Sequence, residues 1–169
     1  MSAPHAIVLM GVSGAGKTTV GKMLADKLGW TFFDADDFHS PANIAKMSQG
    51  NPLDDADRQP WLERLRKEVI DPARDGSPVV LACSGLKASY RKTLGIGEPG
   101  VAAVFLEGDP ATLEERLSAR SGHYMKAGML ASQLEAIEPP SLSDALHVPI
   151  TLSPEEICER IEDSWRAVP

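Results

Sequence analysis

The chain has 169 residues, of which 43% are hydrophobic and 24% are charged, and its formal net charge at pH 7 is −7. This length suits one domain, over residues 1–169, and this composition suits a globular core rather than a disordered chain. An acidic chain is poorly suited to holding nucleic acid by neutralising phosphates, so we expect no nucleic-acid partner.

Apolar runs of strand length alternate with helical periodicity along the chain, a pattern typical of βαβ units around a parallel sheet. We expect five strands, over Ala6–Met10, Thr31–Phe33, Val79–Cys83, Val101–Leu106 and, more weakly, His147–Thr151. We expect helices over Lys17–Leu28, Trp61–Ala73, Leu113–Ala119, Leu130–Ile137 and Pro154–Ala167. Residues 34–57 and 120–129 have the least regular pattern, and we expect substrate-covering loops there.

The first expected strand leads into a glycine-rich segment that matches the phosphate-binding pattern GxxxxGK[ST] and opens the first expected helix. Glycines let successive backbone N–H groups converge on phosphate oxygens, and the helix adds the positive end of its dipole. We predict that Lys17 bridges the outer phosphates of ATP and that the Thr18 hydroxyl binds Mg²⁺. The candidate nucleotide-binding residues of this segment are Gly11, Ser13, Gly14, Ala15, Gly16, Lys17, Thr18 and Thr19.

An acidic pair follows the second expected strand, in the segment Phe33-Asp34-Ala35-Asp36-Asp37. In an extended segment residues 34 and 36 point the same way, so both carboxylates would face the mouth of the crevice. We predict that Asp34 holds Mg²⁺ and that Asp36 accepts or orients the proton of a substrate hydroxyl. The alternative for Asp36 is an acidic turn or a helix cap. A guanine-binding NKxD segment is absent, which argues against a GTPase switch.

Arg116 and Arg120 are four residues apart near the end of an expected helix, so their guanidinium groups share one face. Phosphoryl transfer concentrates negative charge on oxygen atoms, and arginines carried by a closing lid over about residues 120–130 can stabilise it. We predict that Lys17, Asp36 and Arg120 are catalytic and that both arginines contact the nucleotide. The alternative for the pair is a solvated helix face.

The segment from His39 to Leu62 is long and specific, and it reads HSPANIAKMSQGNPLDDADRQPWL. It closely resembles the HxxxNxxKMxxGxPLxDxDRxPWL pattern of gluconokinases, which phosphorylate D-gluconate to 6-phosphogluconate. Similar segments follow at Cys83–Lys87 with Tyr90-Arg91, at Arg120–His123, and at Leu130–Gln133 with Glu138-Pro139. The resemblance implies a three-layer αβα P-loop kinase fold like that of shikimate and adenylate kinases, with a parallel sheet of about five strands and a mobile lid.

Gluconate is a polyol that ends in a carboxylate, so its site needs cations and several hydrogen-bonding groups. Arg58 and Arg91 are the first candidates for contacts with the carboxylate, and we expect Pro60 and Trp61 to begin the helix that aims Arg58. Matching the family's pattern, the candidate substrate residues are Asp36, His39, Lys46, Arg58, Ser84, Lys87, Arg91 and His123.

Structural roles are the alternatives for several of these residues. Lys46 and Lys87 can also be read as exposed helix charges, and His39 as a capping or buried imidazole. Arg58 can also be read as the partner of Asp54 or Asp55 in an ion pair.

Two other functions fit parts of the sequence. A kinase for another small hydroxy acid such as shikimate, or for a nucleoside monophosphate, would use the same acid pair. A nucleotide-binding regulatory module without catalysis is the second, although the intact Lys17, Thr18 and acid pair argue against it.

We also expect a cytoplasmic protein without a membrane partner. The first residues do not form a signal peptide, and no apolar run approaches the roughly 20 residues that span a bilayer. Cys83 and Cys158 lack metal-ligand spacing, so we expect reduced thiols. The resemblance implies that the protein can form a homodimer.

Overall fold

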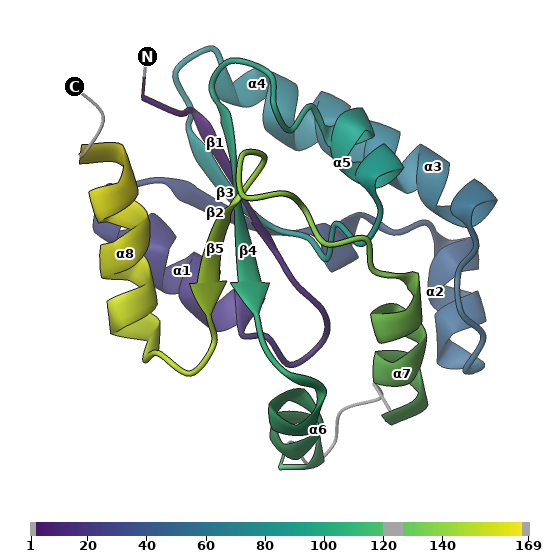
Figure 1. Cartoon of the computed structure of the whole chain (residues 1–169). Coiled ribbons are helices and arrows are strands. Elements are labelled where there is room, and N and C mark those ends of the chain that lie inside the picture. The colour runs from purple at the N-terminus through teal and green to yellow at the C-terminus, as the bar shows by residue number, and fades with distance from the viewer. Residues whose placement is uncertain (1–2, 120–126, 167–169) are drawn as a thin grey trace.

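The computed structural model describes residues 3–119 and 127–166, with side chains for all of these except 127–129 and 166. Five parallel strands form one sheet in the order β2-β3-β1-β4-β5 (Figure 1). The strands are β1 (Ala6–Met10), β2 (Thr31–Asp34), β3 (Val79–Ala82), β4 (Val101–Glu107) and β5 (Leu146–Pro149). The predicted parallel sheet is therefore confirmed.

Helices cover both faces of this sheet. The described α-helices are α1 (Lys17–Leu28), α2 (Pro41–Ser48), α3 (Asp55–Leu65), α4 (Asp71–Ala73), α5 (Ala88–Leu94), α6 (Pro110–Ser118), α7 (Ala127–Ala136) and α8 (Pro154–Arg166). A 3₁₀ turn, η1 (Ala35–Phe38), follows β2, and a π turn, η2 (Arg66–Ile70), joins α3 to α4. Helices α1 and α8 lie on one side of the sheet, and α3, α4 and α5 lie on the other (Figure 1). The three-layer αβα architecture is confirmed.

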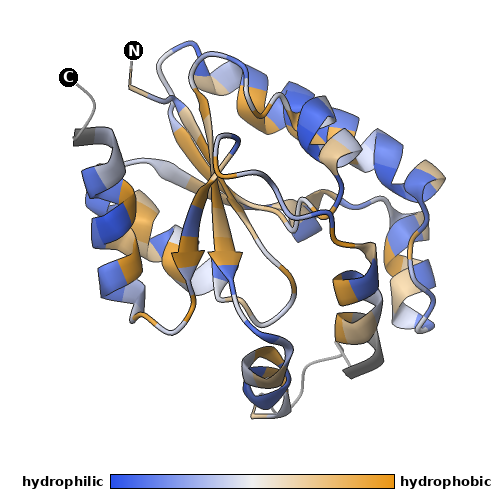
Figure 2. Ribbon diagram, in the orientation of Figure 1, coloured by the Kyte–Doolittle hydropathy of each residue, from blue (hydrophilic) through white to orange (hydrophobic). Residues whose placement is uncertain are grey.

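The core lies between the sheet and these helices. Every residue of β1 and β3 is buried, because helices cover both faces of a parallel sheet. Figure 2 shows the strands as hydrophobic and the outer faces of the helices as hydrophilic. Beyond the carboxyl ends of β4 and β5, α6 and α7 project past the sheet (Figure 1). The polar loops thus gather at the edge where this class of fold binds ligands.

The region expected to begin a helix at Pro60 and Trp61 folds differently. Helix α3 begins at Asp55, because Asp54 and Asp57 form a capping box in which each side chain accepts from the other residue's N–H, at 2.7 and 3.0 Å. Pro60 lies inside the helix rather than at its start. The expected helix start was therefore wrong, and the caps, not the proline, fix the direction of the first turn.

Two helices occur where none was predicted. Helix α2 lies within the expected loop 34–57, where the Ser40 side chain accepts from the N–H of Asn43 at 3.1 Å and Pro41 occupies the first turn. Helix α5 follows β3 and spans seven residues. Both are short, so their periodicity gives little signal. Within the described ranges, no helix combines the length and apolar character needed to cross a membrane.

Candidate active site

The glycine-rich segment forms a loop between β1 and α1. Gly14 and Gly16 have φ angles of 86° and 95°, a left-handed conformation that glycine adopts without a Cβ clash. Gly16 is the N-cap of α1, and no side chain caps this helix start. The Lys17 ammonium folds back and donates to the carbonyls of Gly11 and Val12, at 2.8 and 3.1 Å. The loop, the helix start and the lysine together form a cationic cradle.

Two residues from later in the chain border this cradle. The N–H of Ser13 donates to Oε1 of Gln133 in α7, at 2.7 Å. Arg116 in α6 donates to the carbonyl of Ile150 at 2.6 Å, and its Nη1 lies 3.9 Å from where a Cβ on Gly16 would be. Arg116 therefore lies beside the phosphate loop, and its contact with the nucleotide stays a prediction. Arg120, His123 and residues 120–126 of the expected lid lie outside the described residues.

Asp34 lies at the carboxyl end of β2, opposite the start of α1. Its Oδ2 accepts from the Thr18 hydroxyl at 3.3 Å, while its Oδ1 accepts from the N–H of Asp36 at 3.0 Å and caps η1. The chain thus turns at Ala35, and the extended geometry expected for residues 34–36 was wrong. A hydroxyl and a carboxylate are oxygen ligands of the kind that Mg²⁺ prefers, so this pair fits that ion.

Asp36 sits between the cradle and His39. Its Oδ1 lies 3.8 Å from Nε2 of His39. Withdrawal from bulk water and the Asp34 carboxylate raise the pKa of Asp36 above its usual range, while the Lys17 ammonium opposes them. Because 71% of this side chain remains exposed, water still reaches the Asp36 carboxylate and moderates these effects. An aspartate that is a stronger base than usual suits the acceptance of a proton.

His39 is almost fully buried beneath Asp36. Its ring stacks on the Trp61 indole, with the centroids 4.2 Å apart and the planes at 15°. Trp61 is itself fixed, because its Nε1–H donates to the carbonyl of Ala35 at 2.7 Å. Burial, and then the charge of Arg58, lower the pKa of His39 to about 4. The imidazole is therefore neutral near pH 7.

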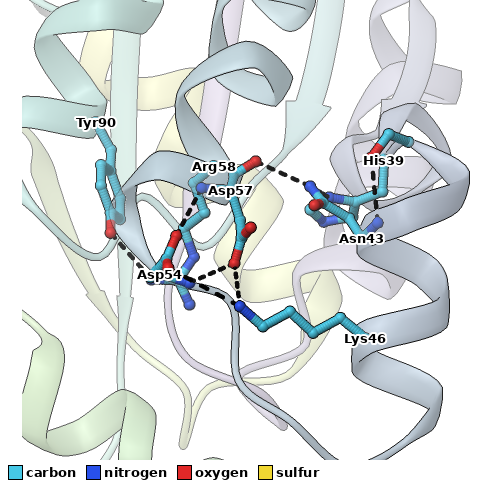
Figure 3. Close-up of polar contacts among 8 residues, drawn as sticks. His39, Asn43, Lys46, Asp54, Asp57, Arg58 and Tyr90 are labelled. Atoms are coloured by element: carbon cyan, nitrogen blue, oxygen red, sulfur yellow. Dashed lines mark hydrogen bonds and ion pairs between the residues drawn. The ribbon is translucent and has the colours of Figure 1, made fainter.

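Lys46, predicted to contact substrate, reaches from α2 to the start of α3 (Figure 3). Its Nζ lies 2.5 Å from Oδ2 of Asp57 and 3.9 Å from Oδ2 of Asp54. These are the two carboxylates of the α3 capping box, so Lys46 ties α2 to the helix that carries Arg58.

Arg58 and Lys87 converge on Tyr90 of α5. Arg58 donates to the Tyr90 hydroxyl at 2.9 Å, with its guanidinium 5.5 Å from the ring centroid (Figure 3). The Tyr90 hydroxyl in turn donates to Asp55, whose carboxylate also pairs with Lys87 at 2.9 Å. Among the described contacts Arg58 forms no ion pair with Asp54 or Asp55, contrary to the structural alternative. Two cations, a phenol and a carboxylate thus form one polar cluster between α3 and α5.

The loop after β3 connects this cluster to the cradle. The carbonyl of Ser84 accepts from the N–H of Gly11 at 3.3 Å, so Ser84 lies beside the phosphate loop. Arg91 is 8% exposed and donates to the carbonyl of Gly85 at 2.8 Å. Burial lowers the pKa of this guanidinium. Arg91 therefore supports the loop from beneath, a more buried position than the sequence predicts for a carboxylate clamp.

Sequence reasoning gave no site role to Asn43, Asp55, Tyr90 or Gln133, which the structure places among the candidate residues. All four stand in segments that resemble the gluconokinase pattern, and Asn43 and Asp55 occupy fixed positions of it, which is the signal that could have found them. Their partners are distant in sequence: Gln133 and Ser13 are 120 residues apart, and Tyr90 and Arg58 are 32 apart. Spacing alone does not reveal such pairs.

Comparison with known proteins agrees with these features. The family model described as shikimate kinase matches residues 13–164. A probable gluconokinase from Xenopus tropicalis is 47% identical, over 80% of this chain and 79% of its own length. The thermosensitive gluconokinase of Escherichia coli K12 is 44% identical, over 84% of this chain and 76% of its own. A gluconokinase structure from Sinorhizobium meliloti 1021 is 38% identical and superposes with a TM-score of 0.83, covering 100% of both chains. The chain therefore belongs to the gluconokinase family, within the kinases that share the shikimate-kinase fold.

Proposed function

We propose that the protein transfers the γ-phosphoryl group of ATP to D-gluconate, giving 6-phospho-D-gluconate and ADP. The observation that carries the proposal is the path of the segment His39–Leu62. It folds as α2 and α3, sets His39 against Asp36, and carries Arg58 and Lys46 beside the cluster around Tyr90. The segment thus links the acceptor side of the crevice to the phosphate cradle.

In the proposed reaction, the backbone N–H groups of the loop and the Lys17 ammonium hold the ATP phosphates, and Arg116 approaches from α6. Thr18 and Asp34 would hold Mg²⁺, which when bound neutralises charge on the phosphate oxygens. Asp36 accepts the proton of the attacking gluconate hydroxyl or orients that hydroxyl toward the γ-phosphate. Arg120 would stabilise the transferring group from the lid, as expected from the sequence.

The cluster between α3 and α5 is the proposed reader of the sugar acid. Arg58 and Lys87 supply positive charge, and the Tyr90 hydroxyl supplies a further hydrogen-bonding group. The Asp55 carboxylate accepts hydrogen bonds from Lys87 and from the Tyr90 hydroxyl. The carboxylate of gluconate could contact the same two groups from the crevice side. This chemistry suits a small acid with several hydroxyl groups better than a nucleoside monophosphate, which carries a base.

The direct test measures ADP formation by the purified protein with ATP, Mg²⁺ and a panel of acceptors. The panel contains D-gluconate, other aldonic acids, shikimate and AMP. We expect kcat/KM for gluconate to exceed that for shikimate and AMP by at least about 100-fold, because unpaired polar groups penalise a wrong substrate. A preference for shikimate would favour the alternative kinase, and tight ATP binding without turnover on any acid would favour a regulatory module.

Replacing Arg58 by lysine tests the reading of gluconate. Lys keeps the charge but loses the two-pronged guanidinium, so Arg58→Lys is expected to lower kcat/KM for gluconate by about 10- to 150-fold with little change in ATP binding. Arg64→Lys is the matched control on α3, since Arg64 contacts Phe38 and Glu68 instead. An unchanged gluconate constant combined with a lowered melting temperature would make Arg58 structural and move the search to Lys87 or Arg91.

We further propose that the protein acts in the cytoplasm as one domain with a lid over about residues 120–130, and that it can form a homodimer. Light scattering of the purified chain would test the dimer.

A further inference from the structure

The buried amide of Asn43 joins three elements of the acceptor side. Asn43 lies in α2 and is 6% exposed. Its Nδ2 is 3.0 Å from the carbonyl oxygen of Asp57 in α3 and 3.4 Å from Nδ1 of His39 (Figure 3). A primary amide nitrogen carries two hydrogens, so one group can serve both contacts.

The orientation of this amide follows from the chemistry of its partners. The Asp57 carbonyl is an acceptor only, so the amide atom facing it must be the nitrogen and not the oxygen. With that nitrogen fixed, its second hydrogen is directed at Nδ1 of His39, which must then be an acceptor. A neutral imidazole whose Nδ1 accepts carries its proton on Nε2.

We propose that Asn43 is a positioning residue, which locks His39 as the Nε2–H tautomer and so aims a neutral N–H donor at the Asp36 carboxylate. The Nε2 atom lies 3.8 Å from Oδ1 of Asp36, within reach of a hydrogen bond after a small side-chain movement. The stack on Trp61 fixes the plane of the ring, and Asn43 fixes the position of its proton.

The charges around His39 agree with this assignment. Arg58, from α3, disfavours a positive imidazolium, and the amide hydrogen of Asn43 would oppose a proton on Nδ1. His39 therefore donates from Nε2 without carrying a charge. In the opposite tautomer, His39 would present a nitrogen lone pair to Asp36. That lone pair would repel the carboxylate and change the orientation of Asp36, the proposed base.

The tautomer can be read directly by long-range ¹H–¹⁵N NMR of the ¹⁵N-labelled protein near neutral pH. The chain has four histidines, and His39→Gln identifies the His39 signals by their loss. We expect a protonated Nε2 and a bare Nδ1 in the wild type, and a mixed or reversed tautomer in Asn43→Leu. Asn51→Leu, at an exposed position just beyond α2, is the matched control. A protonated Nδ1 in the wild type, or an unchanged tautomer in Asn43→Leu, would overturn the proposal.

The kinetics of two His39 variants give a second test, which does not require Asn43→Leu to fold. Glutamine places an amide N–H near the position of Nε2, whereas phenylalanine keeps the stack on Trp61 and has no donor. We expect kcat to fall about tenfold more in His39→Phe than in His39→Gln, with KM for ATP similar in both. A merely structural role predicts the reverse order, because phenylalanine preserves the packing.

The kinetic arm of this inference rests on the proposed role of Asp36 in phosphoryl transfer to gluconate, while the NMR arm needs no substrate. Absence of gluconate turnover together with the expected tautomer would reject the proposed function alone. Gluconate turnover together with the wrong tautomer would reject the role of Asn43 alone.

Discussion

Lys17→Ala is expected to lower kcat by about a thousandfold or more while leaving the melting temperature almost unchanged. The lysine ammonium lies over the phosphate loop, on the carbonyls of Gly11 and Val12, and contributes charge rather than core packing. Its loss leaves the developing negative charge on the transferring group without its cation from the cradle. Steady-state turnover with gluconate and a thermal unfolding curve measure the two parts of this result.

Lys22→Ala is the matched control, since Lys22 is an exposed lysine of the same helix. We expect it to change neither turnover nor stability appreciably. Near-normal turnover of Lys17→Ala would remove the cradle lysine from the mechanism, and an equal loss in Lys22→Ala would point to general damage to α1.

The second large effect is expected for Asp36→Asn, which should lower kcat by about 10²- to 10⁴-fold and leave ATP affinity nearly intact. An amide can hold a hydroxyl group in place but cannot take its proton. Calorimetric binding of ATP with Mg²⁺, beside kcat measured with gluconate, separates the two quantities. Asp37→Asn is the control, because Asp37 is the exposed neighbour in the same turn.

The contrary outcome for Asp36→Asn is also specific. If ATP–Mg²⁺ binding is lost without a separate defect in kcat, the roles of Asp34 and Asp36 are reversed. The contact of Asp34 with Thr18 argues for the present assignment, since it places the Asp34 carboxylate against the other proposed Mg²⁺ ligand.

Much of the fold could be predicted because its signals are local. The bounds of β1 and α1 match the prediction residue for residue, since a buried apolar run and a glycine-rich turn mark both ends. Helix α6 begins three residues earlier than the expected Leu113, because Asp109 caps it and Pro110 occupies its first turn. The start of α3 was missed because a carboxylate capping box competed with a proline as the start signal, and the capping box prevailed.

The candidate site was less predictable, because its contacts depend on tertiary packing. The phosphate loop follows from its pattern, and Asp34 follows from its place at the end of a strand. Whether the lysine in α2 or the one at the N-cap of α5 contacts a substrate or an aspartate depends on how the helices pack, which spacing does not encode. Lys46 and Lys87 both pair with carboxylates of the α3 start, as the charged-helix alternative partly anticipated.

In the phosphate loop, the backbone N–H of Ser13 is already hydrogen-bonded to the side-chain oxygen of Gln133. If the Ser13 N–H binds a phosphate oxygen of ATP, as proposed, that oxygen competes with the glutamine oxygen, and the competition lowers the net affinity for ATP. A few residues further on, Glu138 donates its N–H to the carbonyl of Leu86 at 2.7 Å and accepts from the N–H of Ala88 at 2.8 Å. Gln133 and Glu138 thus lie in one segment, whose hydrogen bonds reach both the phosphate loop and the start of α5. If ATP binding changes the affinity for gluconate through this segment, gluconate binding must change the affinity for ATP by the same factor.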